Sequence, residues 1–278
     1  MRKKFLIVLS IILVLLFFCI VWVIYDYFNA VETTIPTYTD ITSMLEKDNL
    51  TDEDYTLLFQ QTGLGRCAVE DLRTTEKDFV NTIKDFQDQR QEPLFYKQTF
   101  LFFPTTTAEQ LKGKDMQSRL LMLPPLQGGD ILITKSTKTL LFRHGHAGLV
   151  LNGGEQTAES MMIGTTSTIL EIDNWRSYPT LMILRPKQRE HANKAEQFAR
   201  QNMLGIPYNL LTGLIKKDKA DESNMTGTQC AHFVWQAYHQ VGIELDFDGG
   251  WLVTPYDLAN NHDLDMVFSY GFGEDGRW

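Results

Sequence analysis

The stretch GTQCAHFVWQAYHQVG, residues 227–242, joins a short polar turn to an apolar helix and places Cys230 at the junction. Apolar residues then recur at the spacing of one buried helical face, at Phe233, Val234, Ala237 and Val241. Unpaired N–H groups in the first turn of a helix stabilise negative charge, which favours the thiolate form of a cysteine. Cys230 is therefore either a nucleophile or a buried core cysteine, and this stretch alone favours neither.

A cysteine nucleophile needs a base within hydrogen-bond reach, and the chain has six histidines. RHGHAGLVL, residues 143–151, predicts a strand that begins at His146, with His144 on the same side if the strand extends back that far. Gly145 and Gly148 leave room beside His146 for another element to approach. The other four histidines lie in polar or loop contexts or on helix faces that point away, so His146 is the predicted base.

Glu159 is the predicted third member of the site, because a Cys–His pair needs a group that holds the imidazole. In a hairpin of residues 146–152 and roughly 157–162, Glu159 would face His146 from the neighbouring strand. It is the only charged residue in QTAESMMIG (156–164), and a carboxylate there costs free energy unless it is paired. The alternative is a surface glutamate near a turn.

A zinc site competes for the same side chains, which are His144, His146, Cys230 and His232. The H-x-H pair on a strand fits zinc, but Cys230 and His232 diverge from a helix start. No second cysteine pair and no H-E-x-x-H run supports such a site. We predict no metal and no cofactor.

Several segments together resemble the NlpC-type papain-like superfamily of cysteine peptidases and amidases, in its circularly permuted form (the YiiX/YebB-like group). They are GGDILIT (128–134), RHGHAGLVL, the glutamate of TAES, GIPYNLLTG (205–213), the Cys230 helix and DGGWLVTPYDL (248–258). The histidine strand comes 84 residues before the cysteine, whereas it follows the cysteine in the usual order. The resemblance covers about residues 120–265 and implies an α+β, permuted papain-like domain with a small antiparallel sheet.

The resemblance also implies roles for individual residues: Cys230 as nucleophile, His146 as base and Glu159 as third catalytic residue. Tyr208 matches the family's tyrosine near the nucleophile, and is expected to bind substrate close to the oxyanion. Trp251 would be either a substrate wall or a buried aromatic at the domain edge. We assign Tyr208 and Trp251, together with His144, to substrate binding.

The string Cys-Ala-His-Phe-Val, residues 230–234, departs from the C-S-x-L-V of many relatives. It is similar to the N-C-E-H-F-V of lecithin:retinol acyltransferase-like enzymes, a permuted branch that moves acyl groups on lipids. A lipid or thioester acyl hydrolase or acyltransferase is therefore the alternative enzyme. A non-catalytic, tethered binding module is the third possibility.

The first thirty residues differ in composition from the rest of the chain. Arg2, Lys3 and Lys4 precede FLIVLSIILVLLFFCIVWVIY (5–25), which carries no charge and has the length that spans a bilayer as a helix. The stretch DYFNAVE (26–32), which follows the apolar run, is a poor signal-peptidase site, so we predict an uncleaved anchor. Basic residues stay inside, which predicts a single-pass protein of the cytoplasmic membrane with its catalytic domain outside.

The chain divides by pattern into the anchor (1–30), a polar stalk (31–40), a helical region (41–119) and the catalytic domain (120–278). Thr51 with Asp54 predicts a helix start, and Cys67 fits a small core position. Without residues 1–30, which carry three positive charges and Asp26, the net charge of −9 becomes −11. Such an acidic surface excludes nucleic acid as a partner.

The leading hypothesis is a membrane-anchored, extracytoplasmic cysteine hydrolase that cleaves amide bonds in the stem peptides of peptidoglycan. A cell-wall peptide is the expected substrate partner, and the sequence names no protein partner.

Overall fold

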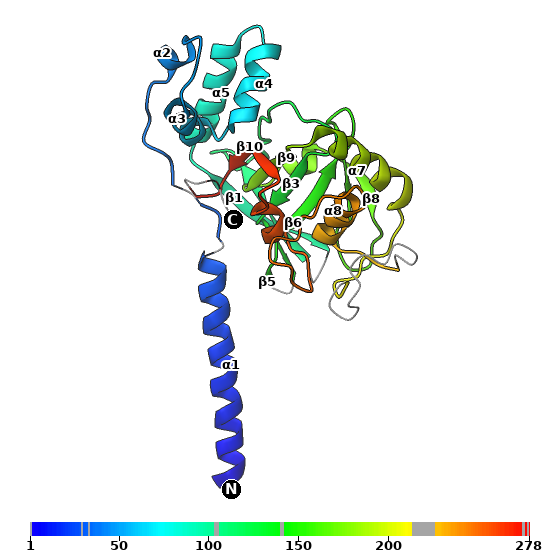
Figure 1. The fold of residues 1–278 in the computed structure, drawn as a ribbon. Helices are drawn as coiled ribbons and strands as arrows, with labels where there is room; N and C mark the ends of the chain where they lie inside the picture. The colour runs from blue at the N-terminus through cyan, green and yellow to red at the C-terminus, as the bar shows by residue number, and fades with distance from the viewer. Residues whose placement is uncertain are drawn as a thin grey trace.

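The computed structural model describes residues 2–28, 30–32, 34–102, 106–139, 142–212, 226–273, 276 and 278. Helix α1 (Arg2–Phe28) projects away from the rest of the protein (Figure 1). Its segment Lys4–Asp26 is long and apolar enough to cross a membrane, and its most apolar part is not buried inside the protein. The predicted apolar helix is confirmed, while its orientation, its retention and the membrane that it crosses stay predictions.

Four helices follow within the region predicted to be helical: α2 (Thr42–Leu45), α3 (Asp52–Thr62), α4 (Arg66–Thr75) and α5 (Phe79–Gln91). Thr51 and Asp54 form a reciprocal capping box at the start of α3, as expected. The helix ends at Gly63, whose φ of 78° is the left-handed conformation that glycine adopts without strain.

The region expected to be helical also contains a β-hairpin, formed by β1 (Phe95–Phe102) and β2 (Thr106–Lys112). This hairpin joins β4 (Thr137–Thr139) and β5 (Phe142–Arg143) in a four-stranded sheet of order β1-β2-β4-β5. The sheet therefore runs across the expected boundary at residue 119, because strands on either side of it share hydrogen bonds.

A six-stranded antiparallel sheet forms the centre of the protein, in the order β10-β9-β3-β6-β7-β8. Its strands are β3 (Ile131–Thr134), β6 (His146–Val150), β7 (Gln156–Glu159), β8 (Thr168–Glu171), β9 (Leu181–Pro186) and β10 (Leu264–Tyr270). The predicted α+β class with small antiparallel sheets is confirmed. Strand β10, which lies at one edge, was not predicted.

Both faces of the six-stranded sheet are buried along β3, β6 and β9, because helices cover each face there. Along β3, Ile131 and Ile133 belong to the core shared with α7 (Arg189–Asn202) and α8 (Cys230–His239). Leu132 points into the core shared with α3, α4 and α5. This alternation is the period of two expected of a strand. Figure 1 shows the two groups of helices on opposite sides of the sheet.

The segment expected to be a stalk is bound to the helical region, so it is not a free spacer. Glutamine side chains of α3 and α5 donate to its backbone: Gln61 to the carbonyl of Thr37 at 2.9 Å, and Gln87 to that of Thr39 at 2.8 Å. Gln91 donates likewise to Pro36 at 3.1 Å. The polar composition of residues 31–40 predicted solvent exposure, but it equally suits a chain whose backbone is satisfied by side-chain amides.

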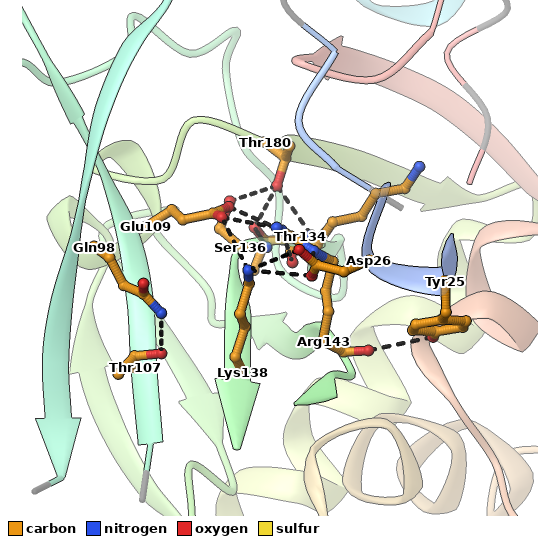
Figure 2. Close-up of polar contacts among 11 residues, drawn as sticks. Tyr25, Asp26, Gln98, Thr107, Glu109, Thr134, Ser136, Lys138, Arg143 and Thr180 are labelled. Atoms are coloured by element: carbon orange, nitrogen blue, oxygen red, sulfur yellow. Dashed lines mark hydrogen bonds and ion pairs between the residues drawn. The ribbon is translucent and has the colours of Figure 1, made fainter. Parts of the chain in front are cut away.

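The end of α1 is joined to the four-stranded sheet by a network of charges (Figure 2). Arg143 in β5 makes two hydrogen bonds to the carboxylate of Glu109 in β2, at 2.8 and 2.9 Å. The guanidinium of Arg143 and the amine of Lys138 also contact Asp26 of α1, both at 3.1 Å. The Tyr25 ring adds a stacked contact on Phe142, with centroids 5.1 Å apart. The anchor and the sheet that precedes His146 are therefore in direct contact.

Replacing Glu109 by glutamine should destabilise the fold, because it leaves the buried charge of Arg143 without its two-bond partner. The two side chains are 6% and 3% exposed. Removing one partner of a buried pair costs about 3 kcal/mol or more, and we expect a loss of this size in urea titrations of the full chain in detergent. Glu92→Gln is the matched control. Glu92 pairs with Arg119 at 2.7 Å but is 54% exposed, so this variant should lose under about 1 kcal/mol of unfolding free energy. Equal losses in the two variants would contradict the prediction.

Candidate active site

His146 and Glu159 meet at one end of the central sheet. His146 is the first residue of β6 and Glu159 is the last residue of β7, and the two strands are antiparallel neighbours. Nε2 of His146 lies 2.6 Å from Oε2 of Glu159. Both side chains are buried. The contact predicted from the hairpin pattern is thus confirmed, whereas the catalytic role of either residue stays a prediction.

Trp175 holds both members of this pair, and the sequence analysis did not identify it. It lies in the short helix α6 (Asp173–Arg176) and is fully buried. Its indole Nε1 donates to Oε1 of Glu159 at 2.7 Å, and its ring stacks on His146 with centroids 5.2 Å apart. Thr157 also donates to Oε1 of Glu159. Three groups therefore compensate one buried carboxylate, which would otherwise be costly to bury.

Gly148 provides the room that this arrangement needs. A Cβ at Gly148 would lie 2.7 Å from Cζ2 of Trp175 and 3.1 Å from Cγ of Glu159. The element predicted to approach beside His146 is thus α6. Gly148 signals in the sequence that another element comes close to this strand, but nothing in the sequence identifies Trp175 as the residue that does so.

Cys230 is the first residue of α8, and this helix packs against β6. Burial tends to lower the pKa of His146, but hydrogen bonds to Cys230 and Glu159, together with their negative charges, raise it overall. Because Nε2 contacts Glu159, Nδ1 is the ring nitrogen that remains for the sulfur. The structure therefore brings the three predicted catalytic residues together, with the imidazole between the thiol and the carboxylate.

Gln229 caps helix α8 and connects Cys230 to the segment that carries Trp251. Its Oε1 accepts from the backbone N–H of Ala231 at 2.9 Å and from the thiol of Cys230 at 3.5 Å. Its Nε2 donates to the carbonyl of Val253 at 2.5 Å. Glutamine is not among the preferred N-cap residues, so the capping role of Gln229 could not be predicted from the sequence.

Of the residues predicted to bind substrate, Tyr208 lies near Cys230. Its backbone pairs with Thr228, two residues before Cys230. Burial, followed by the charge of Cys230, raises the pKa of Tyr208, so its hydroxyl stays protonated as a possible hydrogen-bond donor. Gly213, the last residue of the GIPYNLLTG segment, lies outside the described residues.

His144 and Trp251 have different environments. Nε2 of His144 lies 2.8 Å from the hydroxyl of Thr139, and Nδ1 lies 2.6 Å from the carbonyl of Gly145. Burial lowers the pKa of His144 to about 4, so it is neutral near pH 7. Trp251 is 73% exposed, so the alternative of a buried aromatic is wrong. Substrate binding by either residue stays a prediction.

The four possible zinc ligands do not gather around one point in the described part of the chain. The three-residue metal-ligand group found there consists of Asp246, Asp248 and Asp257. His232 instead contacts the hydroxyl of Thr228 through Nδ1, at 2.9 Å.

The three cysteines are free and occupy distinct environments. Cys67 lines a cavity of about 560 Å³ that also includes residues of α3, α4 and β10, away from Cys230. Burial raises the pKa of Cys67 to about 11, and its thiol donates to the carbonyl of Met266 at 3.3 Å. Cys67 is thus a protonated, hydrogen-bonded thiol, in agreement with a structural role.

Glu159→Gln should flatten the pH dependence of stability that His146 creates. The folded-state pKa of His146 is raised above its usual 6.5. The charged imidazole therefore adds its full contribution to the free energy of unfolding below about pH 6.5, and this contribution is lost as pH rises through the folded-state pKa. Removing the Glu159 charge brings that pKa down. Urea unfolding of the full chain in detergent, repeated from neutral pH upward, measures the slope. Glu171→Gln, an exposed carboxylate on the next strand bonded to Gln156, should keep the wild-type slope. A wild-type slope in Glu159→Gln would refute the assignment.

The comparisons with known proteins gave no match: no family model, no curated protein and no solved structure is similar to this chain.

Proposed function

We propose that this protein is a membrane-anchored cysteine hydrolase that acts outside the cytoplasmic membrane and cleaves amide bonds in peptidoglycan stem peptides. The observation that carries the proposal is the buried imidazole of His146, held by Glu159 at 2.6 Å on the strand against which the Cys230 helix packs. A nucleophile, a base and a group that orients the base are the parts that acyl-enzyme chemistry requires.

In the proposed reaction, Nδ1 of His146 holds the proton of the Cys230 thiol, and the resulting thiolate attacks the carbonyl carbon. His146 then donates this proton to the leaving amine, and a thioester with Cys230 remains. A water that gives its proton to His146 attacks the thioester, which releases the new carboxylic acid and restores the thiol. The backbone N–H of Cys230 and the hydroxyl of Tyr208 are the proposed donors to the oxyanion.

Three features support an extracytoplasmic site of action. The basic residues at the start of α1 favour an inside N-terminus. The contacts of Asp26 with Arg143 and Lys138 hold the body of the protein beside the end of α1. The acidic ectodomain has no electrostatic attraction to nucleic acid. Peptide bonds of the wall close to the membrane are the amide substrates available at this place.

Selective alkylation tests the nucleophile. With iodoacetamide at pH 7, we expect Cys230 in the detergent-solubilised chain to react faster than a model thiol, and faster than Cys67, when each site is quantified by mass spectrometry. His146→Ala should slow labelling of Cys230, whereas His262→Ala, which alters a distant loop histidine, should not. A Cys230 that reacts no faster than the model thiol would leave only a tethered, non-catalytic module.

Peptide release from purified sacculi tests the substrate. Cys230→Ala should lower the rate by about 10³-fold or more, because the covalent path is lost. Cys67→Ala is the matched control and should keep the wild-type rate, since Cys67 lies in a separate cavity. If Cys230→Ala releases wall peptides as fast as wild type, the proposed function is wrong.

One observation favours a second candidate, an acyl hydrolase or acyltransferase that uses the same cysteine. The contacts of Asp26 with Arg143 and Lys138 hold the body of the protein beside the end of α1, which supports a position next to a membrane, where acyl lipids are presented. The intermediate distinguishes the two chemistries. Mass spectrometry of Cys230 trapped with each substrate class should find a peptidyl adduct for the leading proposal and a fatty acyl adduct for the alternative.

A further inference from the structure

Three carboxylates converge where the chain leaves α8 and enters α9 (Pro255–Ala259). Asp246, Asp248 and Asp257 each place one carboxylate oxygen within 4.8 Å of the others. Like charges this close repel one another, and an isolated cluster of this kind is destabilising unless a cation or proton neutralises it. The cluster lies outside the Cys230 site.

A second observation concerns Asp257 itself. Its side chain is nearly fully buried, at 2% exposure of the residue. Oδ2 accepts from the backbone N–H and the hydroxyl of Thr254, at 2.8 and 2.7 Å. Oδ1 is also buried, and it has no hydrogen-bond partner among the residues that the structure describes. Burying a carboxylate oxygen without a hydrogen-bond partner costs free energy, so the unpaired Oδ1 indicates that a ligand binds to it.

We propose that Asp246, Asp248 and Asp257 bind one Ca²⁺ ion. Two oxygens on the same Ca²⁺ are at most about 5 Å apart, since each Ca–O bond is about 2.4 Å long, and the observed spread fits within this limit. The ligands are all oxygens, and the intervening segment contains Gly249 and Gly250, so it can adapt to the irregular coordination that Ca²⁺ accepts.

The spacing of the three residues supports the same ion. They occupy positions 1, 3 and 12 of the stretch DFDGGWLVTPYD, residues 246–257. An EF-hand loop uses side chains at these positions among its ligands. The stretch departs from that motif at its sixth position, where Trp251 replaces glycine, so the shared feature is the placement of charge and not the whole fold of the loop.

Ca²⁺ at this place would order the segment beside the nucleophile. The carbonyl of Val253 accepts from Gln229, which caps α8 next to Cys230. Val253 and the exposed Trp251 both lie between the second and third proposed ligands. The ion would therefore fix one wall of the Cys230 site. The binding claim itself does not depend on the proposed hydrolase activity.

Terbium luminescence tests the site, because Tb³⁺ replaces Ca²⁺ and an adjacent indole sensitises its emission. In the detergent-solubilised full chain, we expect saturable Tb³⁺ emission on tryptophan excitation, with displacement by Ca²⁺ at about 0.1–1 mM, the range of extracellular calcium modules. Trp251→Phe should abolish most of this emission. Emission that Ca²⁺ does not displace, or that survives in Trp251→Phe, would overturn the assignment.

Asp248→Asn should weaken Ca²⁺ binding by about tenfold or more, because it removes one of three ligand charges. Asp115→Asn is the matched control: Asp115 and Asp248 each accept a hydrogen bond from the backbone N–H two residues further on. Binding is also read without terbium, as a rise in the thermal unfolding midpoint on adding Ca²⁺. This rise should persist in Asp115→Asn and Trp251→Phe, whereas Asp248→Asn should need about tenfold or more Ca²⁺ to reach the same rise. No rise in wild type, or an equal rise in Asp248→Asn, would refute the proposal.

Discussion

The candidate site depends on how one buried carboxylate is neutralised. Glu159 has no access to water, so its charge is tolerated only because His146, Trp175 and Thr157 all contact it. These contacts fix the plane of the imidazole and leave one ring nitrogen for Cys230. Removing the carboxylate would leave the indole and the imidazole without their shared partner, so the site has few alternative arrangements of similar free energy.

Trp175 also gives the N-terminal region a structural role. It belongs to the core that includes residues of α3, α4 and α5, while Cys230 belongs to the core on the α8 side. The segment before β3 adds to this support, because Leu121 exchanges hydrogen bonds with Arg176 of α6 in both directions, each at 2.8 Å. The chain before β3 thus stabilises α6, which in turn holds His146 from the side opposite to Cys230.

The sequence predicts the parts of the fold and of the candidate site that local residue patterns determine. It does not predict the parts that depend on tertiary contacts. The strands at residues 128–134, 146–152, 167–172 and 180–186 were recognisable because each has a continuous run of β-branched and other apolar residues. His146 and Glu159 could be paired because the period of two in a hairpin is fixed. Trp175 could not be assigned, since its helix is four residues long and is held by tertiary contacts. The cap formed by Gln229 depends in the same way on Val253, which is distant in sequence.

The contact between α1 and β5 has a consequence for where the body of the protein can lie relative to its anchor helix. A catalytic domain on a long flexible tether samples a volume, whereas one clamped to its anchor through Asp26 and Arg143 keeps a nearly constant height and tilt. Its encounters then become a search in two dimensions, governed by lateral diffusion. If α1 spans a bilayer, a body held in this way would meet only molecules that lie in a thin layer parallel to it.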